Sequence, residues 1–227
     1  MTHVDQTLDR ERSLDGALDG ALDERGRRWL AQALERIRER EEAVLELFPV
    51  AGRACGRGPM PGAPGVTVDQ AVRERLLTAL SSRGAELGEL LWRVYRYGDA
   101  AERIAVLRAL GRLDADGALG EHGLRIVRDA IRTNDARMIE AAVGPYGARR
   151  LPDAEYRQAV LKCVFVGVPL SAVAGLEQRA DRELARMLAD YAHERTVAGR
   201  DVPADVRPLI RRHPDVTEGR RLPEGWL

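Results

Sequence analysis

His193 is the residue whose type best suits it to move a proton, and two carboxylates stand close to it in the sequence. Asp190 lies three positions before it and Glu194 directly follows it. At about 100° per residue, His193 points away from the apolar face of its predicted helix. If this side lines a groove, the carboxylates could fix the imidazole tautomer, so His193 and Asp190 are catalytic candidates and Glu194 a ligand-binding one. The alternative is a histidine in contact with water.

Four more side chains are candidates for binding a ligand. Arg132 offers a planar fork of donors and Asn134 an amide group, and both lie between two predicted helices. Tyr146 offers a hydroxyl group within a Gly-Pro-Tyr-Gly turn. Lys162 is the single lysine of the chain, and a buried lysine can act as a base. The structural alternatives are a helix cap at Asn134, a ring in the core at Tyr146 and a solvated ammonium group at Lys162.

Other common kinds of active site find no support in the sequence. The four histidines lie on different predicted elements, and none has a second ligand three or four positions further on. Asp114 and Asp116 fall in a turn between helices, where aspartate is favoured in any case. Cys163 lies on an apolar face and is predicted to be a small core residue. We therefore expect no metal site and no cofactor.

Composition limits the classes of partner. The chain has 36 basic and 36 acidic residues, whereas a nucleic-acid-binding protein usually has a basic surplus. Residues 1–23 lack the apolar run of a signal peptide, and no stretch approaches the roughly 20 apolar residues that span a bilayer. We expect a cytoplasmic protein that binds no nucleic acid and has no integral membrane segment. Peripheral contact with a membrane partner stays open.

The hydrophobic pattern predicts an all-α fold. Apolar residues recur at helical spacing, and no segment alternates with period two for long enough to be a strand. Helices of 12 to 18 residues joined by short turns indicate stacked antiparallel helix pairs, either as a degenerate α-solenoid of the HEAT type or as an irregular bundle. We expect a helical arm at 1–50, a Gly/Pro-rich loop or linker at 51–66, a helical domain at 67–212 and a flexible tail at 213–227.

Four local signals predict where helices begin and end. Thr67 and Asp99 are each followed three positions later by a glutamine or a glutamate, which is the spacing of a capping box. Asp181 is predicted to cap the helix that carries Leu188. Pro49 is predicted to end the helix that begins near residue 24, because proline lacks the amide hydrogen that a helix needs.

An ordered series of motifs over roughly residues 85–210 resembles the EboA family. The series consists of Arg132-Thr-Asn, Gly144-Pro-Tyr, Leu151-Pro, Gln158-Ala-Val-Leu-Lys, Phe165-Val-Gly-Val-Pro-Leu, Gly175-Leu, Glu183-Leu-Ala-Arg-Met, Asp190-Tyr-Ala-His-Glu-Arg and Ala198-Gly-Arg. At one position the chain departs from the family, which often has asparagine where this sequence has Gly144. The resemblance does not cover the N-terminal arm or the Gly/Pro-rich loop.

The resemblance implies a metabolic role. EboA-like proteins are encoded beside a prenyltransferase-like membrane protein and several enzyme-like proteins, among them one similar to sugar-phosphate cyclases. This setting implies the biosynthesis or traffic of a cyclitol-like or prenylated small metabolite, and it assigns EboA no reaction. Our leading hypothesis is a non-catalytic protein that binds this metabolite or holds enzymes of the same operon together. The alternatives are an enzyme acting on a polyol or prenylated intermediate, and a pure protein–protein adaptor.

Overall fold

The computed structural model describes residues 16–63 and 65–226, and nothing is described of residues 1–15, 64 and 227. The predicted all-α fold is confirmed. The described residues form α-helices and short 3-10 helices, with no strand and one isolated bridge between Pro59 and Thr67. Contacts within the chain divide it into a first unit that ends at Gly123 and a second that begins at Leu124.

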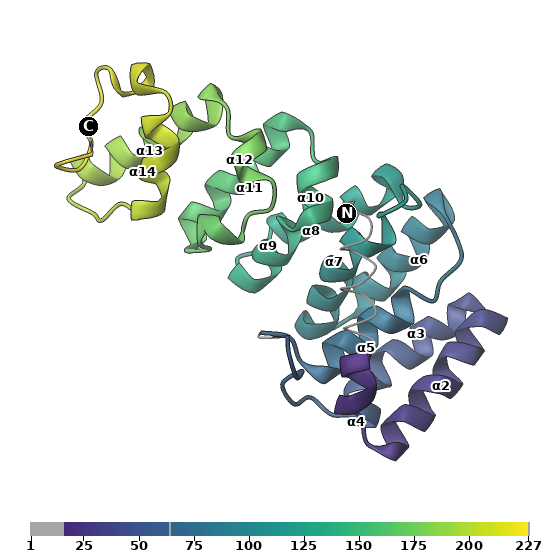
Figure 1. The fold of residues 1–227 in the computed structure, drawn as a ribbon. Helices are drawn as coiled ribbons and strands as arrows, with labels where there is room; N and C mark the ends of the chain where they lie inside the picture. The colour runs from purple at the N-terminus through teal and green to yellow at the C-terminus, as the bar shows by residue number, and fades with distance from the viewer. Residues whose placement is uncertain (1–15, 64, 227) are drawn as a thin grey trace, which may run out of the picture. The chain divides into compact units, whose positions relative to one another are not determined.

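The first unit is drawn from purple to teal in Figure 1. Residues 16–21 are helical, although the first part of the predicted arm lies outside the described residues. The remaining elements are α2 (Glu24–Glu39), η1 (Glu41–Ala43), α3 (Val44–Leu47), η2 (Phe48–Val50), α4 (Ala51–Cys55), α5 (Val68–Leu77), α6 (Gly84–Tyr97), α7 (Ala100–Leu113) and η3 (Gly120–Gly123).

Two predicted capping boxes are present in the first unit. The Gln70 side chain accepts a hydrogen bond from the Thr67 amide (3.2 Å), and α5 begins directly afterwards. Asp99 accepts from the Glu102 amide (2.8 Å), while the Glu102 carboxylate accepts from the Asp99 amide (3.2 Å). These contacts satisfy amide groups that the first turn of a helix leaves free. They fix the beginnings of α5 and α7, which pack against each other.

The helical course around Pro49 differs from the prediction. The helix that begins at Glu24 ends at Glu39, and the chain then continues through short helices on both sides of the proline. Pro49 lies in the first turn of η2, where its missing amide hydrogen removes no bond. Residues 51–55 of the predicted loop form α4, so the prediction that Pro49 ends the helical stretch is wrong.

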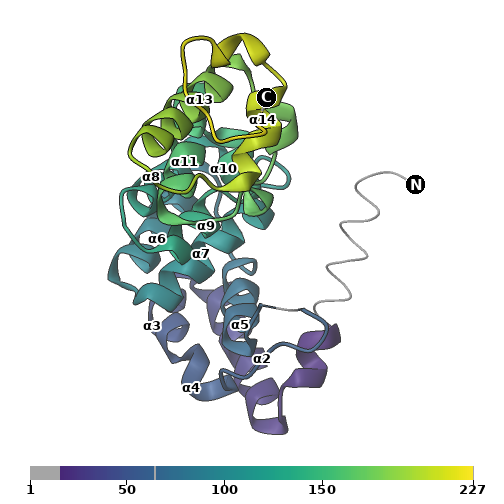
Figure 2. The same cartoon turned by 90° about the vertical axis from the view of Figure 1, so that its left-hand side faces the viewer.

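The second unit is drawn from green to yellow, and Figure 2 shows it from another side. Its α-helices are α8 (Leu124–Ile131), α9 (Ala136–Ala142), α10 (Pro145–Arg150), α11 (Asp153–Val166), α12 (Leu176–Arg179), α13 (Arg182–Val197) and α14 (Arg207–Arg211). Its 3-10 helices are η4 (Leu170–Ala172), η5 (Ala204–Val206) and η6 (Pro214–Thr217). Helix α11 packs against both α9 and α13, and η6 packs against α13.

The longest helix of the second unit begins at its predicted cap and ends at a glycine. Asp181 accepts a hydrogen bond from the Leu184 amide (2.9 Å) at the start of α13. After its last turn, Gly199 adopts a positive φ of 65°, and the Arg200 amide donates to the Arg195 carbonyl (2.8 Å). This is the glycine-terminated helix end that the sequence indicates. Helix α10 was predicted only as a turn, but Pro145 stands in its first turn, where proline is tolerated.

The predicted division at 51–66, 67–212 and 213–227 stays a prediction, as does the choice between a solenoid and a bundle. In the described part of the chain, none of the helices combines the length and the apolar character that crossing a membrane requires.

Candidate functional site

One pair of the predicted site residues meets in the second unit. The Lys162 ammonium group, on α11, donates a hydrogen bond to the Asn134 side-chain oxygen (3.0 Å). Asn134 is exposed and lies just before α9, which explains how α9 and α11 bring the two side chains together. The contact joins an amide and an ammonium group at the protein surface. It places Lys162, which is half-buried, at the surface rather than alone in the core.

Arg132 and Tyr146 lie in different surroundings from this pair. The side chain of Arg132 is exposed at the end of α8. Tyr146 is only 2% exposed, at the beginning of α10. Its ring therefore belongs to the core, as the structural alternative for this residue proposed. Cys163 is also a core residue, and burial raises the pKa of its thiol to about 12.

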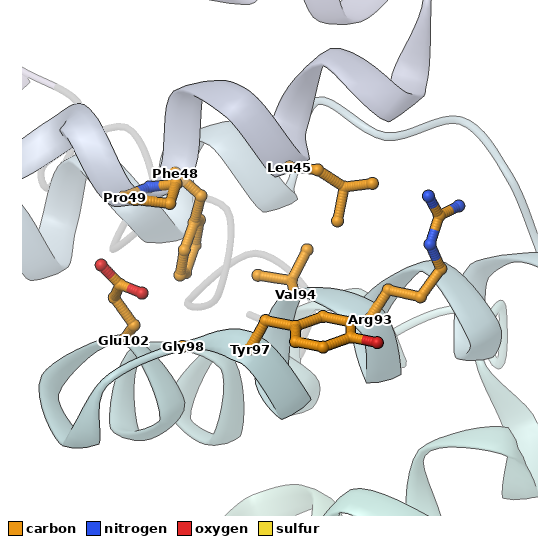
Figure 3. A pocket seen from close by; sticks show the side chains of 8 residues that line it. All are labelled: Leu45, Phe48, Pro49, Arg93, Val94, Tyr97, Gly98 and Glu102. Atoms are coloured by element: carbon orange, nitrogen blue, oxygen red, sulfur yellow. The ribbon is translucent and has the colours of Figure 1, made fainter.

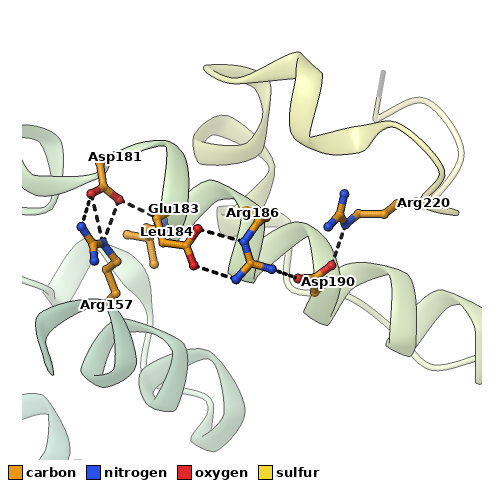
Figure 4. A network of polar contacts seen from close by, with 7 residues as sticks. All are labelled: Arg157, Asp181, Glu183, Leu184, Arg186, Asp190 and Arg220. Carbon is orange, nitrogen blue, oxygen red and sulfur yellow. Dashed lines mark hydrogen bonds and ion pairs between the residues drawn. The ribbon is translucent and has the colours of Figure 1, made fainter. Parts of the chain in front are cut away.

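Asp190 and His193 contact the segment that follows α14, and Figure 4 shows the contact of Asp190 with Arg220. The Asp190 carboxylate accepts one hydrogen bond from Arg186 (2.6 Å) and another from Arg220 (2.6 Å). The Nδ1 atom of His193 accepts a hydrogen bond from the Arg221 amide (2.8 Å). Glu194 is exposed. Asp190 and His193 thus hold residues 213–226 against α13.

The polar contacts along α13 form a row that extends from Asp190 toward the start of the helix (Figure 4). Arg186 also donates to Glu183 (2.6 Å), one turn earlier. At the start of the helix, Arg157 of α11 donates to Asp181 (3.0 Å from Nε to Oδ1). Among the described residues, no hydrogen bond or ion pair joins this row of polar contacts to the pair of Asn134 and Lys162. The structure therefore brings four of the predicted site residues into two separate groups, Asn134 with Lys162, and Asp190 with His193 beside residues 220 and 221.

A cavity that the sequence did not indicate lies in the first unit (Figure 3). Its volume is about 170 Å³. The side chains around it come from the short helices near Pro49, from the end of α6 and from the beginning of α7, and they are Leu45, Phe48, Pro49, Arg93, Val94, Tyr97, Gly98 and Glu102. Most of these side chains are apolar, and the charged groups of Arg93 and Glu102 lie at different ends of the row that Figure 3 shows.

The two ends of the cavity differ in their exposure to water. Tyr97 has 80% of its surface exposed and forms part of the rim, and Arg93 is also exposed. Glu102 is only 7% exposed. A side chain at position 98 would not fit here, because its Cβ would lie 2.9 Å from the Glu102 Cβ. Gly98 therefore allows the Glu102 side chain to lie close to the end of α6.

Glu102 belongs to a buried ionic cluster. Arg73 is 1% exposed and forms a hydrogen-bonded ion pair with Asp69. Its guanidinium group also lies 3.6 Å from the Glu102 carboxylate and donates to the Phe48 carbonyl (3.3 Å). The cluster contains two carboxylates and one guanidinium group, so it carries one excess negative charge. A buried charge needs partners, because removing it from water is costly.

Part of this site could have been found from the sequence. The spacing of Asp99 and Glu102 predicts a capping box, which turns Glu102 back toward the start of α7. The apolar pattern of residues 24–48 includes Leu45 and Phe48. The pattern does not predict that α3 packs against α6, because contacts between distant segments are a property of the folded chain. The burial of Arg73 was missed for the same reason.

The described residues thus define an all-α protein with a small, mainly apolar cavity that has a charged group at each end. A family model described as "Metabolite traffic protein EboA" matches residues 53–211, which is more than half of the chain. The chain belongs to the EboA family. The match begins before residue 85 and includes part of the Gly/Pro-rich segment, so the expected boundaries of the resemblance are corrected. Searches of curated proteins and of solved structures found no match.

Proposed function

We propose that this protein binds a small, partly apolar metabolite of its pathway in the cavity between α3 and α6, and does not alter it chemically. The membership of a family named for metabolite traffic supports a role with small molecules. The observation that carries the proposal is the cavity itself, which has apolar walls, an exposed aromatic ring at the rim and two charged ends. Small-molecule sites commonly combine apolar walls with a few polar groups.

The size of the cavity indicates which part of a metabolite it holds. Its volume of about 170 Å³ is close to the ~150 Å³ of an apolar cavity that binds benzene. Drug-sized ligands usually occupy about 300 Å³ or more. The cavity therefore suits a group of about five or six carbon atoms, such as one isoprene unit, with the rest of the ligand outside. Of the two metabolite classes expected, these apolar walls favour a prenylated molecule over a cyclitol.

The enzyme alternative has less support. Proton transfer by His193 and Asp190 would require both groups to face a substrate, but Asp190 accepts hydrogen bonds from two arginines and the His193 Nδ1 atom is engaged by the Arg221 amide. Neither residue lines the cavity between α3 and α6. We therefore propose binding without a reaction.

Binding of prenol, a five-carbon isoprenoid alcohol, tests the proposal. Saturation-transfer NMR should detect prenol on the wild-type protein. Val94 is buried in the cavity wall, so Val94→Phe should fill the cavity and abolish the signal. Tyr97→Ala should weaken binding about two- to tenfold, which corresponds to the ~0.5–1.5 kcal/mol of an aromatic contact.

Matched control substitutions exist in the other unit. Val197 and Phe165 are 59% and 61% exposed. Val197→Phe repeats the valine-to-phenylalanine change outside the unit that contains the cavity, and Phe165→Ala removes another exposed aromatic ring there. Both should bind prenol as the wild-type protein does. Failure of prenol to bind the wild-type protein, or equal binding by Val94→Phe and Val197→Phe, would contradict the proposal. Circular dichroism should show that each variant retains its helices.

A second candidate, the adaptor, is favoured by one observation. The exposed ring of Phe165 packs edge-on against Tyr191, with the centroids 4.9 Å apart, and Arg195 lies over the Tyr191 ring. Aromatic residues and arginine are enriched at the energetic centres of protein interfaces. If the protein acts as an adaptor, Phe165→Ala should lose a partner enzyme in a co-purification experiment, while Tyr97→Ala should keep it.

A further inference from the structure

The buried carboxylate at one end of the cavity determines which chemical group a ligand can place there. We infer that the ligand carries a cationic hydrogen-bond donor, such as an amine, at the end that meets Glu102, and that a phosphate or carboxylate group is rejected there. This inference rests on the proposed function, because it assumes that the cavity between α3 and α6 is the binding site. It goes further by naming the chemical class of the ligand.

Glu102 has acceptor capacity beyond its contacts in the protein. Its Oε2 atom accepts one hydrogen bond from the Asp99 amide (3.2 Å). Its Oε1 atom lies 3.6 Å from Arg73, which is longer than a hydrogen bond. An ionised carboxylate can accept about four hydrogen bonds. A donor group in the cavity would therefore find lone pairs available on a side chain that is 10% exposed.

The charge around Glu102 favours a cation. The Arg73 guanidinium group is shared between Asp69 and Glu102, and Asp99 adds a third carboxylate that accepts from the Glu102 amide. Arg103 also lies nearby and donates to the Gly98 carbonyl (3.0 Å). Asp99 is exposed and Arg103 is partly exposed, so their opposite charges offset each other, and the buried group of Asp69, Glu102 and Arg73 keeps one carboxylate in excess. An ammonium group would balance this charge, whereas a phosphate would be repelled.

Arg93, at the other end, has a weaker influence. Its side chain is exposed, and ion pairs in contact with water are screened and contribute little. Glu102 lies in an environment of lower effective dielectric constant, where charge interactions are stronger. The buried carboxylate, rather than the exposed guanidinium group, should therefore set the preference for the end group of the ligand. An anionic group elsewhere on the same ligand could still lie near Arg93.

Three probes with the same five-carbon chain test the inference: prenylamine, prenol and dimethylallyl phosphate. On the wild-type protein, saturation-transfer titrations should give prenylamine about fivefold tighter binding than prenol. Both probes can donate a hydrogen bond to Glu102, but only the ammonium group adds the attraction of opposite charges. Dimethylallyl phosphate should bind more weakly than prenol. Glu102→Gln should reduce the difference between amine and alcohol to less than about twofold, since glutamine keeps the shape and can still complete a capping box.

Two further variants distinguish the effect of Glu102 from a general effect of removing a charge. Glu86→Gln removes one negative charge from an exposed position on α6 and should leave the fivefold preference unchanged. Arg93→Gln should also keep the order of the three probes. If Arg93→Gln abolishes the preference for prenylamine, or Glu86→Gln reduces it as much as Glu102→Gln does, the inference is wrong.

The outcomes distinguish failure of the inference from failure of the proposed function. Equal binding of the three probes would overturn the inference and leave the cavity as the binding site. Tightest binding of dimethylallyl phosphate would also overturn it, and would assign the end group to Arg93. If no probe binds to the wild-type protein, the proposed site is wrong and the inference fails with it. The order in which the wild-type protein binds the three probes tests the inference even if Glu102→Gln does not fold.

Discussion

Asp190 accepts a hydrogen bond from Arg186 on its own helix and another from Arg220, 30 positions further along the chain. Because it accepts these two hydrogen bonds, the Asp190 carboxylate has a structural role: it fixes residues 213–226 against α13. His193 contributes through the Arg221 amide. Because a protonated Nδ1 atom cannot accept a hydrogen bond, this contact requires a His193 ring without a proton on Nδ1. At the scale of single residues, the catalytic candidates have partners that explain their positions.

Arg73 is the charged residue whose loss should cost most. Arg73→Leu would leave Asp69 and Glu102 buried without their cation, and breaking a buried pair in this way costs about 3–5 kcal/mol. Urea unfolding followed by circular dichroism would measure the loss. Arg28→Leu is the matched control, because Arg28 pairs with Glu24 on an exposed face of α2, and it should change stability by less than about 1 kcal/mol. A similar, small effect of both changes would argue against the buried cluster.

Leu188 and His193 lie on different sides of α13 and should respond differently to truncation. Leu188 is fully buried, so Leu188→Ala should cost about 2–5 kcal/mol through the cavity that it leaves. His193→Ala removes one partly exposed hydrogen bond and should cost less than about 1 kcal/mol. Urea unfolding of both variants checks the difference. A large loss in the His193 variant would show that the side chain belongs to the core.

At the scale of elements, α13 depends on charges at its N-terminus. The hydrogen bond from Arg157 lowers the pKa of Asp181, and the hydrogen bond from Arg186 lowers the pKa of Glu183. A lowered pKa in the folded state means that the stabilisation is fully present above the ordinary carboxyl range near pH ~4. It is lost as the pH falls through the lowered value. The start of α13 should therefore loosen in acid.

Asp181→Asn tests this dependence while keeping a residue type that caps helices well. At about pH 7 the variant should be less stable than the wild-type protein, by less than about 1 kcal/mol because the pair is partly exposed. At a pH below the lowered pKa of Asp181 the two proteins should have the same stability, since the aspartate is then protonated. Urea unfolding at both pH values measures the difference. A difference that does not change with pH would exclude the ion pair as its cause.

The elements also show what the sequence can and cannot predict. The caps at Thr67, Asp99 and Asp181 were predicted because a cap depends on residues three positions apart. The short helices that contain Pro49 and Pro145 were missed, because proline is compatible with a first turn as well as with a break. Sequence patterns report local order, so they predict helix ends better than the packing of short helices.

At the scale of the whole molecule, the site residues predicted from the sequence and the cavity of the proposed site lie in different units. The candidates from the sequence, such as Asn134 and His193, all follow Leu124, whereas the cavity belongs to the unit that ends at Gly123. The cavity depends on Phe48 and Val94 coming together from segments far apart in the sequence. Reasoning from residue types favours polar groups, and it could not find a site whose walls are mostly apolar.

The central claim is that a metabolite occupies this cavity and leaves it unaltered. Mass spectrometry of small molecules that co-purify with the protein, expressed together with the products of its neighbouring genes, tests this claim most directly. A molecule with an apolar group should accompany the wild-type protein and Val197→Phe, be absent from Val94→Phe, and keep its mass after incubation. Retention of the molecule by Val94→Phe with loss from Asn134→Ala, or a changed mass, would contradict the account.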